Sequence, residues 1–215
     1  MHSHFANIIF DLDGTLIDSA QSVIDALEQA CRDSGIAPAR PITKDLVGPS
    51  LSQIAAQLEG KGNTADQEKI MQAFKQLYDA HFCIQAVPFP GIASLLQHVC
   101  EEHPLYIVTN KRLAPTERII SHLGWGSYFT GIYSPDSIMP AAASKTVLLA
   151  HVLSACRIDT VHCVYVGDTL ADKEAAEANA LPCLLVDHGY GDIADDAATF
   201  NVPRLHQYIN AARSN

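Results

Sequence analysis

The 215-residue chain carries 24 Asp and Glu residues against 14 Lys and Arg residues, a formal net charge of −10 at pH 7. A nucleic-acid-binding protein needs a basic surface, so this balance argues against nucleic acid as a partner. It equally disfavours attachment to an anionic membrane. Hydrophobic residues make up 48% of the chain, which is enough to bury the core of one large domain or two modest ones.

The beginning of the chain and its cysteines both favour a cytoplasmic protein. The first residues, MHSHFANIIF, lack the basic start of a signal peptide. No run approaches the roughly 20 apolar residues of a membrane span. The six cysteines are scattered and form no CxxC pair, which indicates reduced thiols rather than disulfides or a zinc site.

Short apolar runs that alternate with helical patterns predict the fold. The expected strands are residues 7–10 (NIIF), 105–108 (LYIV), 163–166 (CVYV) and 183–186 (CLLV). Each run is continuously apolar, as in strands that are buried on both faces of a parallel sheet. The expected helices, with apolar residues three and four apart, are residues 91–101, 113–123, 145–155 and 171–180. This alternation predicts an α/β core, a doubly wound parallel sheet of the Rossmann-like type.

A helical segment interrupts the alternation after the first strand. Ser19 is expected to cap a helix that runs to Ser34 and stops at Gly35. Further helical patterns follow at residues 51–58 and 64–82, with no strand pattern among them. We therefore predict two domains, which are an α/β core of residues 1–15 and 84–215 and an all-helical cap of residues 16–83.

Polar side chains follow three of the expected strands. They are Asp11 and Asp13 after the first, Thr109 and Asn110 after the second, and Asp168 after the third. Ligands of open α/β sheets bind beyond the carboxyl ends of the strands, so these residues are expected to converge on one rim. Two residues apart in extended chain, Asp11 and Asp13 point to the same side. Three carboxylates in one place need a cation among them, and oxygen-only ligands favour a hard ion. Magnesium is the first candidate, with manganese and calcium open.

A lysine near the start of a helix suggests that the ligand is a phosphate. Ser144 is a good N-cap, which places Lys145 in the first turn, where the helix dipole disfavours a cation. The position makes better sense if Lys145 faces an anion held at the same helix start. The Thr109 hydroxyl, the backbone amide of Asn110 and Lys145 would then cradle a phosphoryl group, which Asp11 would attack while Asp13 handles the proton.

Four sequence elements together resemble the motifs of the haloacid dehalogenase superfamily. They are DLDGTL (residues 11–16), TNK (residues 109–111), the isolated Lys145 and VGDTLAD (residues 166–172). Their order and spacing fit, the match spans nearly the whole chain, and the helical insert resembles the cap of one branch. The phosphoglycolate phosphatase-like members are the most similar. Thr146, in place of the usual proline, and Asn179, in place of a frequent glycine, depart from the pattern without touching the chemistry.

The resemblance implies a two-step hydrolysis of a phosphate ester. Asp11 would be the nucleophile that forms an aspartyl-phosphate, and Asp13 would be the general acid and then the general base. Magnesium would be held by Asp11, the backbone carbonyl of Asp13 and Asp168, with Asp172 in support. Lys145 would neutralise charge on the phosphoryl oxygens.

Substrate contacts are expected from both parts of the chain. The loop LVGPSLSQ gives Gly48, Pro49 and Ser50 as candidates to select the leaving group. Lys111, beside Thr109 and Asn110, is either pocket lining or surface charge. GYGDIA, residues 189–194, mimics a dinucleotide fingerprint, but we expect a loop over the rim of the site.

The leading interpretation is a magnesium-dependent phosphatase whose partner is a small phosphorylated metabolite. Candidate substrates are 2-phosphoglycolate, a nucleoside monophosphate, which would make the protein a nucleotidase, and a sugar phosphate. A phosphomutase that uses the same intermediate and a phospho-aspartate signalling receiver are the alternatives. The sequence leaves open whether the protein is a monomer or a homodimer.

Overall fold

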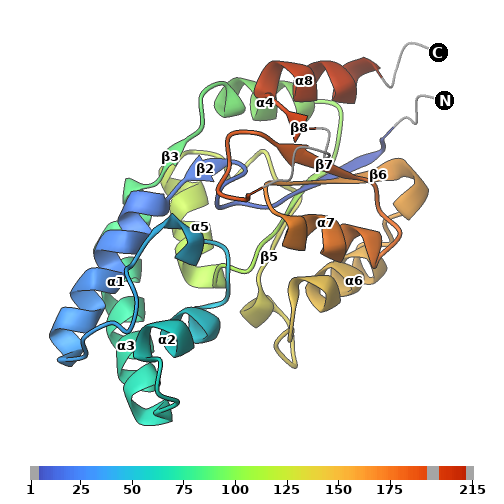
Figure 1. The fold of residues 1–215 in the computed structure, drawn as a ribbon. Helices are drawn as coiled ribbons and strands as arrows, with labels where there is room; N and C mark the ends of the chain where they lie inside the picture. The colour runs from blue at the N-terminus through green and yellow to red at the C-terminus, as the bar shows by residue number, and fades with distance from the viewer. Residues whose placement is uncertain (1–4, 193–198, 212–215) are drawn as a thin grey trace.

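The computed structural model describes residues 5–192 and 199–211, and within these ranges six parallel strands form one sheet (Figure 1). The strand order is β5-β4-β1-β6-β7-β8. The strands are β1 (Asn7–Phe10), β4 (Leu105–Val108), β5 (Gly131–Tyr133), β6 (Cys163–Gly167), β7 (Cys183–Val186) and β8 (Thr199–Phe200). The predicted doubly wound α/β fold is confirmed. The unpredicted strands β5 and β8 are three and two residues long and lie at the two edges of the sheet, where little apolar sequence is needed.

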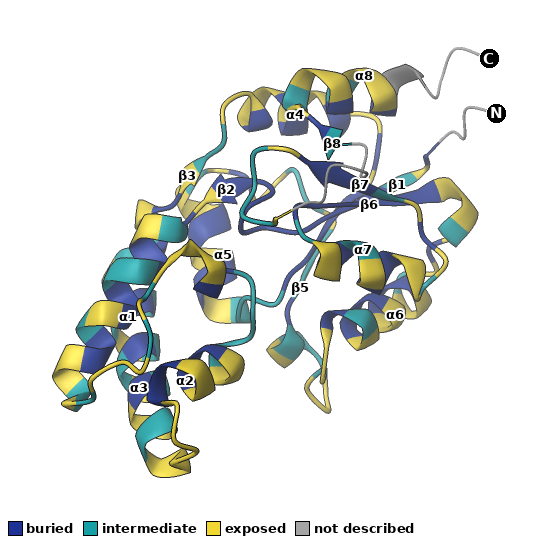
Figure 2. Ribbon diagram, in the orientation of Figure 1, coloured by how far each residue is buried: buried dark blue, intermediate teal, exposed yellow. Residues whose placement is uncertain are grey.

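Alternate side chains of the central strands supply two separate cores (Figure 2). Ile8 and Phe10 point to the face covered by α4 (Ile92–Val99), α5 (Leu113–His122) and α8 (Val202–Ala211). Ile9 points to the other face, which α6 (Lys145–Ala155) and α7 (Leu170–Glu177) cover. All three side chains are fully buried. Burial on both faces explains why this strand is apolar at every position up to Asp11.

Three helices follow β1 and pack against one another beside the sheet rather than on it (Figure 1). They are α1 (Ala20–Ser34), α2 (Leu51–Glu59) and α3 (Thr64–Leu77). A 3-10 turn precedes α2 at Lys44–Leu46. The predicted helix 64–82 changes character, because α3 passes into a π-helical turn, Tyr78–Phe82, and a 3-10 turn, Cys83–Gln85. No helix in the described ranges has the length and apolar character to cross a membrane.

The two chain segments that connect the helices to the sheet are hydrogen-bonded to each other. The short strands β2 (Ile17–Asp18) and β3 (Val87–Pro88) pair antiparallel, and the Phe89 amide donates to the Leu16 carbonyl at 3.2 Å. The helical elements lie between these strands, which is the arrangement that a cap domain would need. The division into core and cap domains at residues 16–83 stays a prediction.

The two ends of α1 are stabilised differently from each other. Gly35 adopts φ 67° and donates its amide to the Arg32 and Cys31 carbonyls, so the predicted C-terminal stop is confirmed. Ser19 occupies the N-cap position, but its side chain makes no capping hydrogen bond. The Ser19 hydroxyl donates to Asp13 instead, so the expectation of a capping side chain is wrong.

Shortening one buried side chain of the sheet tests how much its packing contributes to stability. Ile107 lies in β4 and is fully buried, so we expect Ile107→Ala to lower the free energy of unfolding by about 3 kcal/mol, through lost apolar burial and the cavity left behind. Urea unfolding measures this change. The control Val161→Ala removes methyl groups from a residue that is 67% exposed and should change stability by less than about 0.5 kcal/mol. An equal loss in both variants would contradict the expectation.

Candidate active site

Asp11 lies where the central strand leaves the sheet. Its amide continues the ladder by donating to the Val166 carbonyl at 2.9 Å, and its side chain is almost completely buried. Gly14 then turns the chain with φ 82°, and a Cβ at this position would lie 2.1 Å from Asp168 Oδ2. Glycine is therefore required here both by the left-handed backbone and by the close approach of Asp168.

Lys145 lies between two buried carboxylates. Ser144 caps α6 by accepting from the Val147 amide, as predicted. The Lys145 Nζ atom is 3.1 Å from Asp11 Oδ1 and donates to Asp172 Oδ1. Burial lowers the pKa of Lys145, but attraction to Asp11 and Asp172 outweighs burial and holds this pKa above its usual range. The lysine is therefore a fixed positive charge next to Asp11.

Asp172 holds that lysine in place. It is the third residue of α7 and forms a reciprocal capping box with Thr169. Its Oδ2 atom accepts from the amides of Asp168 and Thr169 and from the Thr169 hydroxyl, while its Oδ1 atom accepts from Lys145 and Tyr165. Although burial raises its pKa, Lys145 and Thr169 outweigh this effect and lower the pKa of Asp172. Asp172 therefore stays ionised.

Asp11, Asp168 and Asp172 form a buried acidic cluster, which we call the carboxylate triad. One oxygen of each residue lies within 4.8 Å of the others. Burial, opposed by Lys145 and assisted by the neighbouring carboxylates, raises the pKa of Asp11 to about 7. Burial and Asp172 raise the pKa of Asp168 to about 6. The buried Asp11 Oδ1 atom has the Lys145 ammonium as its charged partner, at 3.1 Å. These features fit a hard divalent cation, which prefers carboxylate oxygens and relieves their repulsion.

Asp13 has a different environment from the carboxylate triad. Its Oδ1 atom accepts from the Ser19 hydroxyl and lies 3.1 Å from Lys111 Nζ. Lys111 also donates to the Tyr78 hydroxyl at 2.8 Å and lies over the Tyr78 ring. The Asp13 side chain therefore faces the cap helices, away from the triad, and only its backbone carbonyl remains to serve the predicted metal site.

The predicted phosphate-binding residues also lie at this rim. Thr109 is buried and its hydroxyl accepts from the Lys111 amide at 3.2 Å. The Asn110 side chain donates to the Gly48 carbonyl at 3.1 Å, so it bridges to the loop that precedes α2. Lys111, for which the sequence left two interpretations open, lines the site. Its side chain is only 8% exposed.

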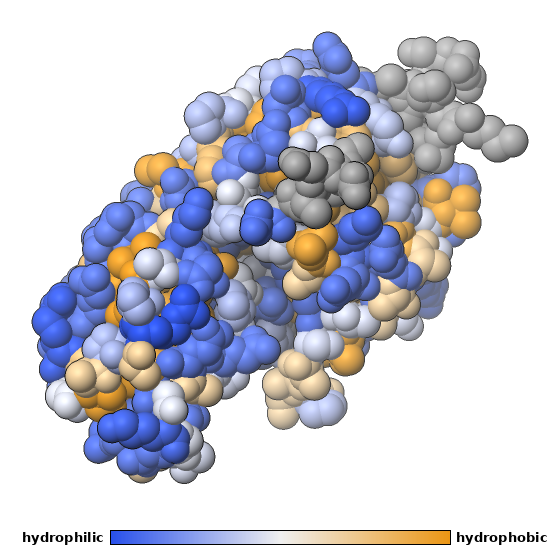
Figure 3. All heavy atoms as spheres, in the orientation of Figure 1, coloured by the Kyte–Doolittle hydropathy of each residue, from blue (hydrophilic) through white to orange (hydrophobic). Residues whose placement is uncertain are grey.

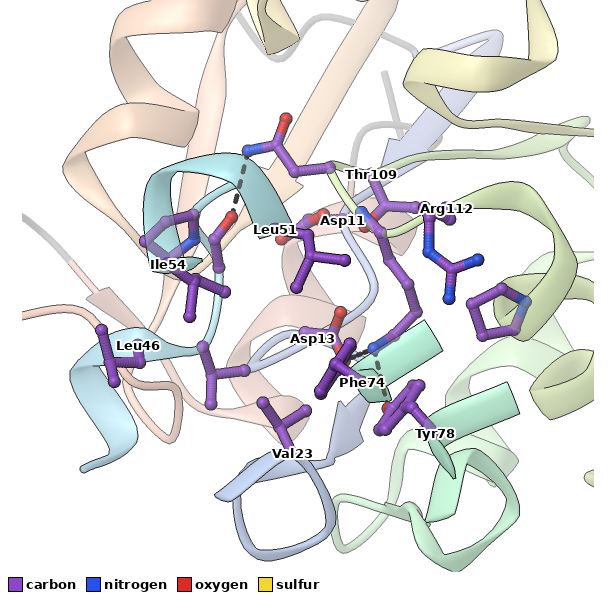
Figure 4. A pocket seen from close by; sticks show the side chains of 16 residues that line it. Asp11, Asp13, Val23, Leu46, Leu51, Ile54, Phe74, Tyr78, Thr109 and Arg112 are labelled. Carbon is purple, nitrogen blue, oxygen red and sulfur yellow. Dashed lines mark hydrogen bonds and ion pairs between the residues drawn. The ribbon is translucent and has the colours of Figure 1, made fainter. Parts of the chain in front are cut away.

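Two cavities meet at Asp11 and Asp13. The smaller one, about 70 Å³, lies against the cap helices, and Figure 4 shows apolar side chains such as Val23 and Phe74 beside Asp13. Its apolar wall comprises Val23, Leu46, Val47, Leu51, Ile54 and Phe74. The larger cleft, about 1230 Å³, runs between α2 and the starts of α6 and α7, and Figure 3 shows a notch in the hydrophilic surface between these parts.

The loop predicted to select the substrate reaches both cavities. Gly48 and Pro49 line the smaller cavity and the cleft together with Asp11 and Asp13. Ser50 lines the cleft and caps α2 through a capping box with Gln53. The structure therefore brings all eleven predicted site residues to the two cavities or to the adjoining triad.

Sequence reasoning missed three residues that complete the site. Tyr78 belongs to a helical pattern and resembles an ordinary core residue. Thr15 donates to Asp168 Oδ1 at 3.1 Å, and the Tyr190 amide donates to Asp168 Oδ2 at 2.8 Å. The glycines around Tyr190 were a usable signal, because they indicate a close backbone approach. Residues 189–192 of the predicted rim loop are described and Ala194 lies outside the described residues.

The family model described as haloacid dehalogenase-like hydrolase matches residues 8–186. The chain therefore belongs to the haloacid dehalogenase-like hydrolase family, and the sequence-based assignment is confirmed.

Three curated relatives carry different names. A 5'-nucleotidase of Pseudomonas aeruginosa is 28% identical over 87% of this chain and 85% of its own length. A phosphoglycolate phosphatase of Xylella fastidiosa is 30% identical over 92% and 87%. The tyrosine-protein kinase PtkA of Mycobacterium tuberculosis is 30% identical over 89% of this chain and 66% of its own length.

A solved structure agrees in fold. A haloacid dehalogenase-like family hydrolase from Streptococcus pneumoniae has a TM-score of 0.78 and 26% identity, covering 89% of each chain. The fold is therefore shared across most of both chains.

The unequal environments of two triad members predict opposite stability changes in the metal-free protein. Asp172→Asn removes the anion that holds buried Lys145, so we expect the free energy of unfolding to fall by about 3 kcal/mol. Asp168→Asn removes a repelling charge but keeps groups that can bond Thr15 and Tyr190, so we expect stability to rise. Urea unfolding in chelator measures both variants, and a fall of similar size in both would contradict this electrostatic account.

The raised pKa values also predict how metal-free stability depends on pH. Folded Asp11 and Asp168 hold protons with pKa values of about 7 and about 6, against an ordinary value of 3.8. The folded state therefore binds protons more tightly, and its stability is lost as pH rises from about 4 to about 7. We expect urea unfolding in chelator to show this decline and Asp168→Asn to flatten it. An unchanged slope in Asp168→Asn would contradict the expectation.

Proposed function

We propose that the protein is a magnesium-dependent phosphatase that hydrolyses a small phosphomonoester through an aspartyl-phosphate on Asp11. Its class is phosphoric monoester hydrolase, which the family match and the phosphatase names of its relatives support. The observation that carries the proposal is the placement of Asp11. This buried carboxylate has Lys145 Nζ at 3.1 Å, belongs to the carboxylate triad and borders an open cleft.

Asp11, Asp168 and the backbone carbonyl of Asp13 would hold the magnesium ion. The bound ion would neutralise the triad and the phosphoryl oxygens that approach it. We assign Asp172 chiefly to Lys145, since both oxygens of Asp172 already accept hydrogen bonds. The sequence placed Asp172 in support of the metal site, and this assignment makes that support indirect, through Lys145.

The chemistry would proceed in two displacements. In the first, an Asp11 oxygen forms a bond to phosphorus while the bond from phosphorus to the leaving oxygen breaks, and Asp13 gives its proton to that oxygen. In the second, Asp13 takes a proton from water, whose oxygen attacks the same phosphorus and releases Asp11 and inorganic phosphate. Lys145 stabilises negative charge on the phosphoryl oxygens in both steps.

Asp13 suits this acid–base role because of where its side chain points. Asp11 and Asp13 stand two residues apart, yet Asp11 faces Lys145 while Asp13 faces Ser19 and Lys111. The two carboxylates therefore have separate tasks. Asp13 borders both cavities, which places it beside either path for a leaving group.

Remaining polar groups at the rim would bind the substrate. We assign Thr109 and Asn110 to the phosphoryl group, and Lys111 to the boundary between phosphate and leaving group. Gly48, Pro49 and Ser50 would contact the leaving group from the cap side. Movement of the helical segment would then open and close the cleft between the two displacements.

Two substrate classes remain in competition. A compact ester such as 2-phosphoglycolate fits the smaller cavity, and relatives in Neisseria and Xylella are named phosphoglycolate phosphatases. A nucleoside monophosphate would need the larger cleft, whose volume of about 1230 Å³ favours this second candidate, a nucleotidase. The relative named 5'-nucleotidase supports it.

Phosphate release from a panel of phosphomonoesters tests the proposal. We expect magnesium-dependent turnover that chelator abolishes and that added magnesium restores. Asp11→Asn keeps the size of the side chain but removes the nucleophile, so its turnover should fall by at least about 1000-fold. Phosphate release from 2-phosphoglycolate and nucleoside monophosphates ranks the two substrate classes.

Matched controls separate the nucleophile from general damage. Asp33→Asn changes an exposed carboxylate on α1 that lines neither cavity, and it should retain turnover within a few-fold. Substantial turnover by folded Asp11→Asn, with native circular dichroism, would refute the assignment of the nucleophile.

A further inference from the structure

The loop that follows β7 contacts both connections between the sheet and the cap helices. The Tyr190 hydroxyl accepts from the Ser19 and Ala20 amides at 2.7 and 3.0 Å and donates to Asp18 Oδ1 at 2.7 Å. On the second connection, the Tyr190 ring lies 6.4 Å from the Phe89 ring, measured between centroids. The mechanism proposed above uses none of these contacts.

The Tyr190 hydroxyl binds two backbone amides at the start of α1. The first amides of a helix have no partner within the helix and need an acceptor. Ser19 stands at the N-cap, but its hydroxyl is committed to Asp13. The phenol oxygen of Tyr190 accepts from the amide of Ser19 itself and from that of Ala20, the first residue of α1, whose amide also donates to Asp18 Oδ1 at 3.1 Å. The start of α1 is therefore held from the sheet, 170 residues away in the chain.

The same residue holds a member of the carboxylate triad. The Tyr190 amide donates to Asp168 Oδ2 at 2.8 Å. A Cβ at Gly189 would lie 2.2 Å from Asp168 Cβ, and one at Gly191 would lie 2.2 Å from the Asp168 carbonyl oxygen. The two glycines therefore let the loop backbone pack directly on Asp168, which leaves little freedom for one to move without the other.

We propose that Tyr190 is a positioning residue that couples the orientation of Asp168 to the position of α1. The inference rests on the proposed function, in which Asp168 holds magnesium. A cation bound by Asp168 would change the orientation of the Asp168 side chain and therefore the position of the Tyr190 amide bonded to it. Because the Tyr190 ring is rigid, its hydroxyl would move with the backbone and shift the Ser19 and Ala20 amides. Because coupling between two sites is reciprocal, the position of α1 also changes the affinity of the metal site.

The coupling extends to the proposed acid–base residue. The Ser19 amide donates to the Tyr190 hydroxyl, and the Ser19 hydroxyl donates to Asp13. A shift of the first turn of α1 therefore reaches Asp13 as well as Asp168. Tyr190, which lines the cleft, thus links the two sides of the site.

Tyr190→Phe is the decisive variant, because it removes only the hydroxyl and keeps the ring and the amide bonded to Asp168. Magnesium chloride is titrated into the full chain, with binding followed by calorimetry and amide exchange followed in peptides that cover residues 17–23. In the unchanged protein we expect magnesium to slow exchange in these peptides. In Tyr190→Phe this slowing should be lost, and magnesium should bind about 3- to 10-fold more weakly, as expected for one lost hydrogen-bonding hydroxyl.

Two further variants make the result interpretable. Asp18→Ala removes the acceptor of the Tyr190 hydroxyl at an exposed position and should reduce the magnesium effect in the same direction. Tyr208→Phe removes a hydroxyl from α8, where the ring packs on Phe5 and Phe200, and it should leave both readouts unchanged.

Failure of the coupling can be told apart from failure of the proposed function. Magnesium binding to the unchanged protein without any slowing of exchange in residues 17–23 would overturn the coupling alone. So would a folded Tyr190→Phe that responds to magnesium like the unchanged protein. Absence of magnesium binding to the unchanged protein would overturn the metal assignment and the coupling together.

Discussion

The rest of the site depends on negative charge that is buried at the carboxyl end of β1. Asp11 and Asp168 lose most of their hydration there, and each repels the other members of the carboxylate triad. Such a cluster is unfavourable unless positive charge is brought to it. Lys145 supplies one charge and the oxygen-only donor set favours a divalent cation for the remainder. Because its carboxylate has lost most of its hydration, Asp11 would be a better nucleophile toward a phosphorus atom held beside these cations.

The fold keeps two neighbouring carboxylates in separate environments. Gly14 turns the chain immediately after Asp13, so Asp11 stays with the sheet while Asp13 faces the cap helices. Each carboxylate forms an ion pair with its own lysine, Asp11 with Lys145 and Asp13 with Lys111. These separate surroundings let two carboxylates within three residues serve the different tasks proposed for them.

Three polar contacts between the helical segment and the core are made by residues adjacent to the proposed chemistry. Asn110 reaches the Gly48 carbonyl, Lys111 reaches the Tyr78 hydroxyl, and Tyr190 reaches the start of α1. All three contacts are hydrogen bonds made by residues that line the cavities of the site. Any displacement of the helical segment therefore changes the surroundings of a proposed substrate- or metal-binding residue, which is how a cap can control water and substrate access.

The sequence alone determined the four central strands of the sheet, the order of these strands and their helices along the chain, and the polar residues at the rim. Continuous apolar runs require burial on both faces, and the carboxyl ends of parallel strands meet at one edge. Only the tertiary structure decided how those residues divide the work. That Asp172 holds Lys145, that Ser19 bonds Asp13 rather than capping its own helix, and that Tyr190 binds the first amides of α1 all depend on groups from distant segments meeting in three dimensions. Local propensity carries no information about such partners, because the same serine or tyrosine satisfies several acceptors and donors equally well until packing selects one.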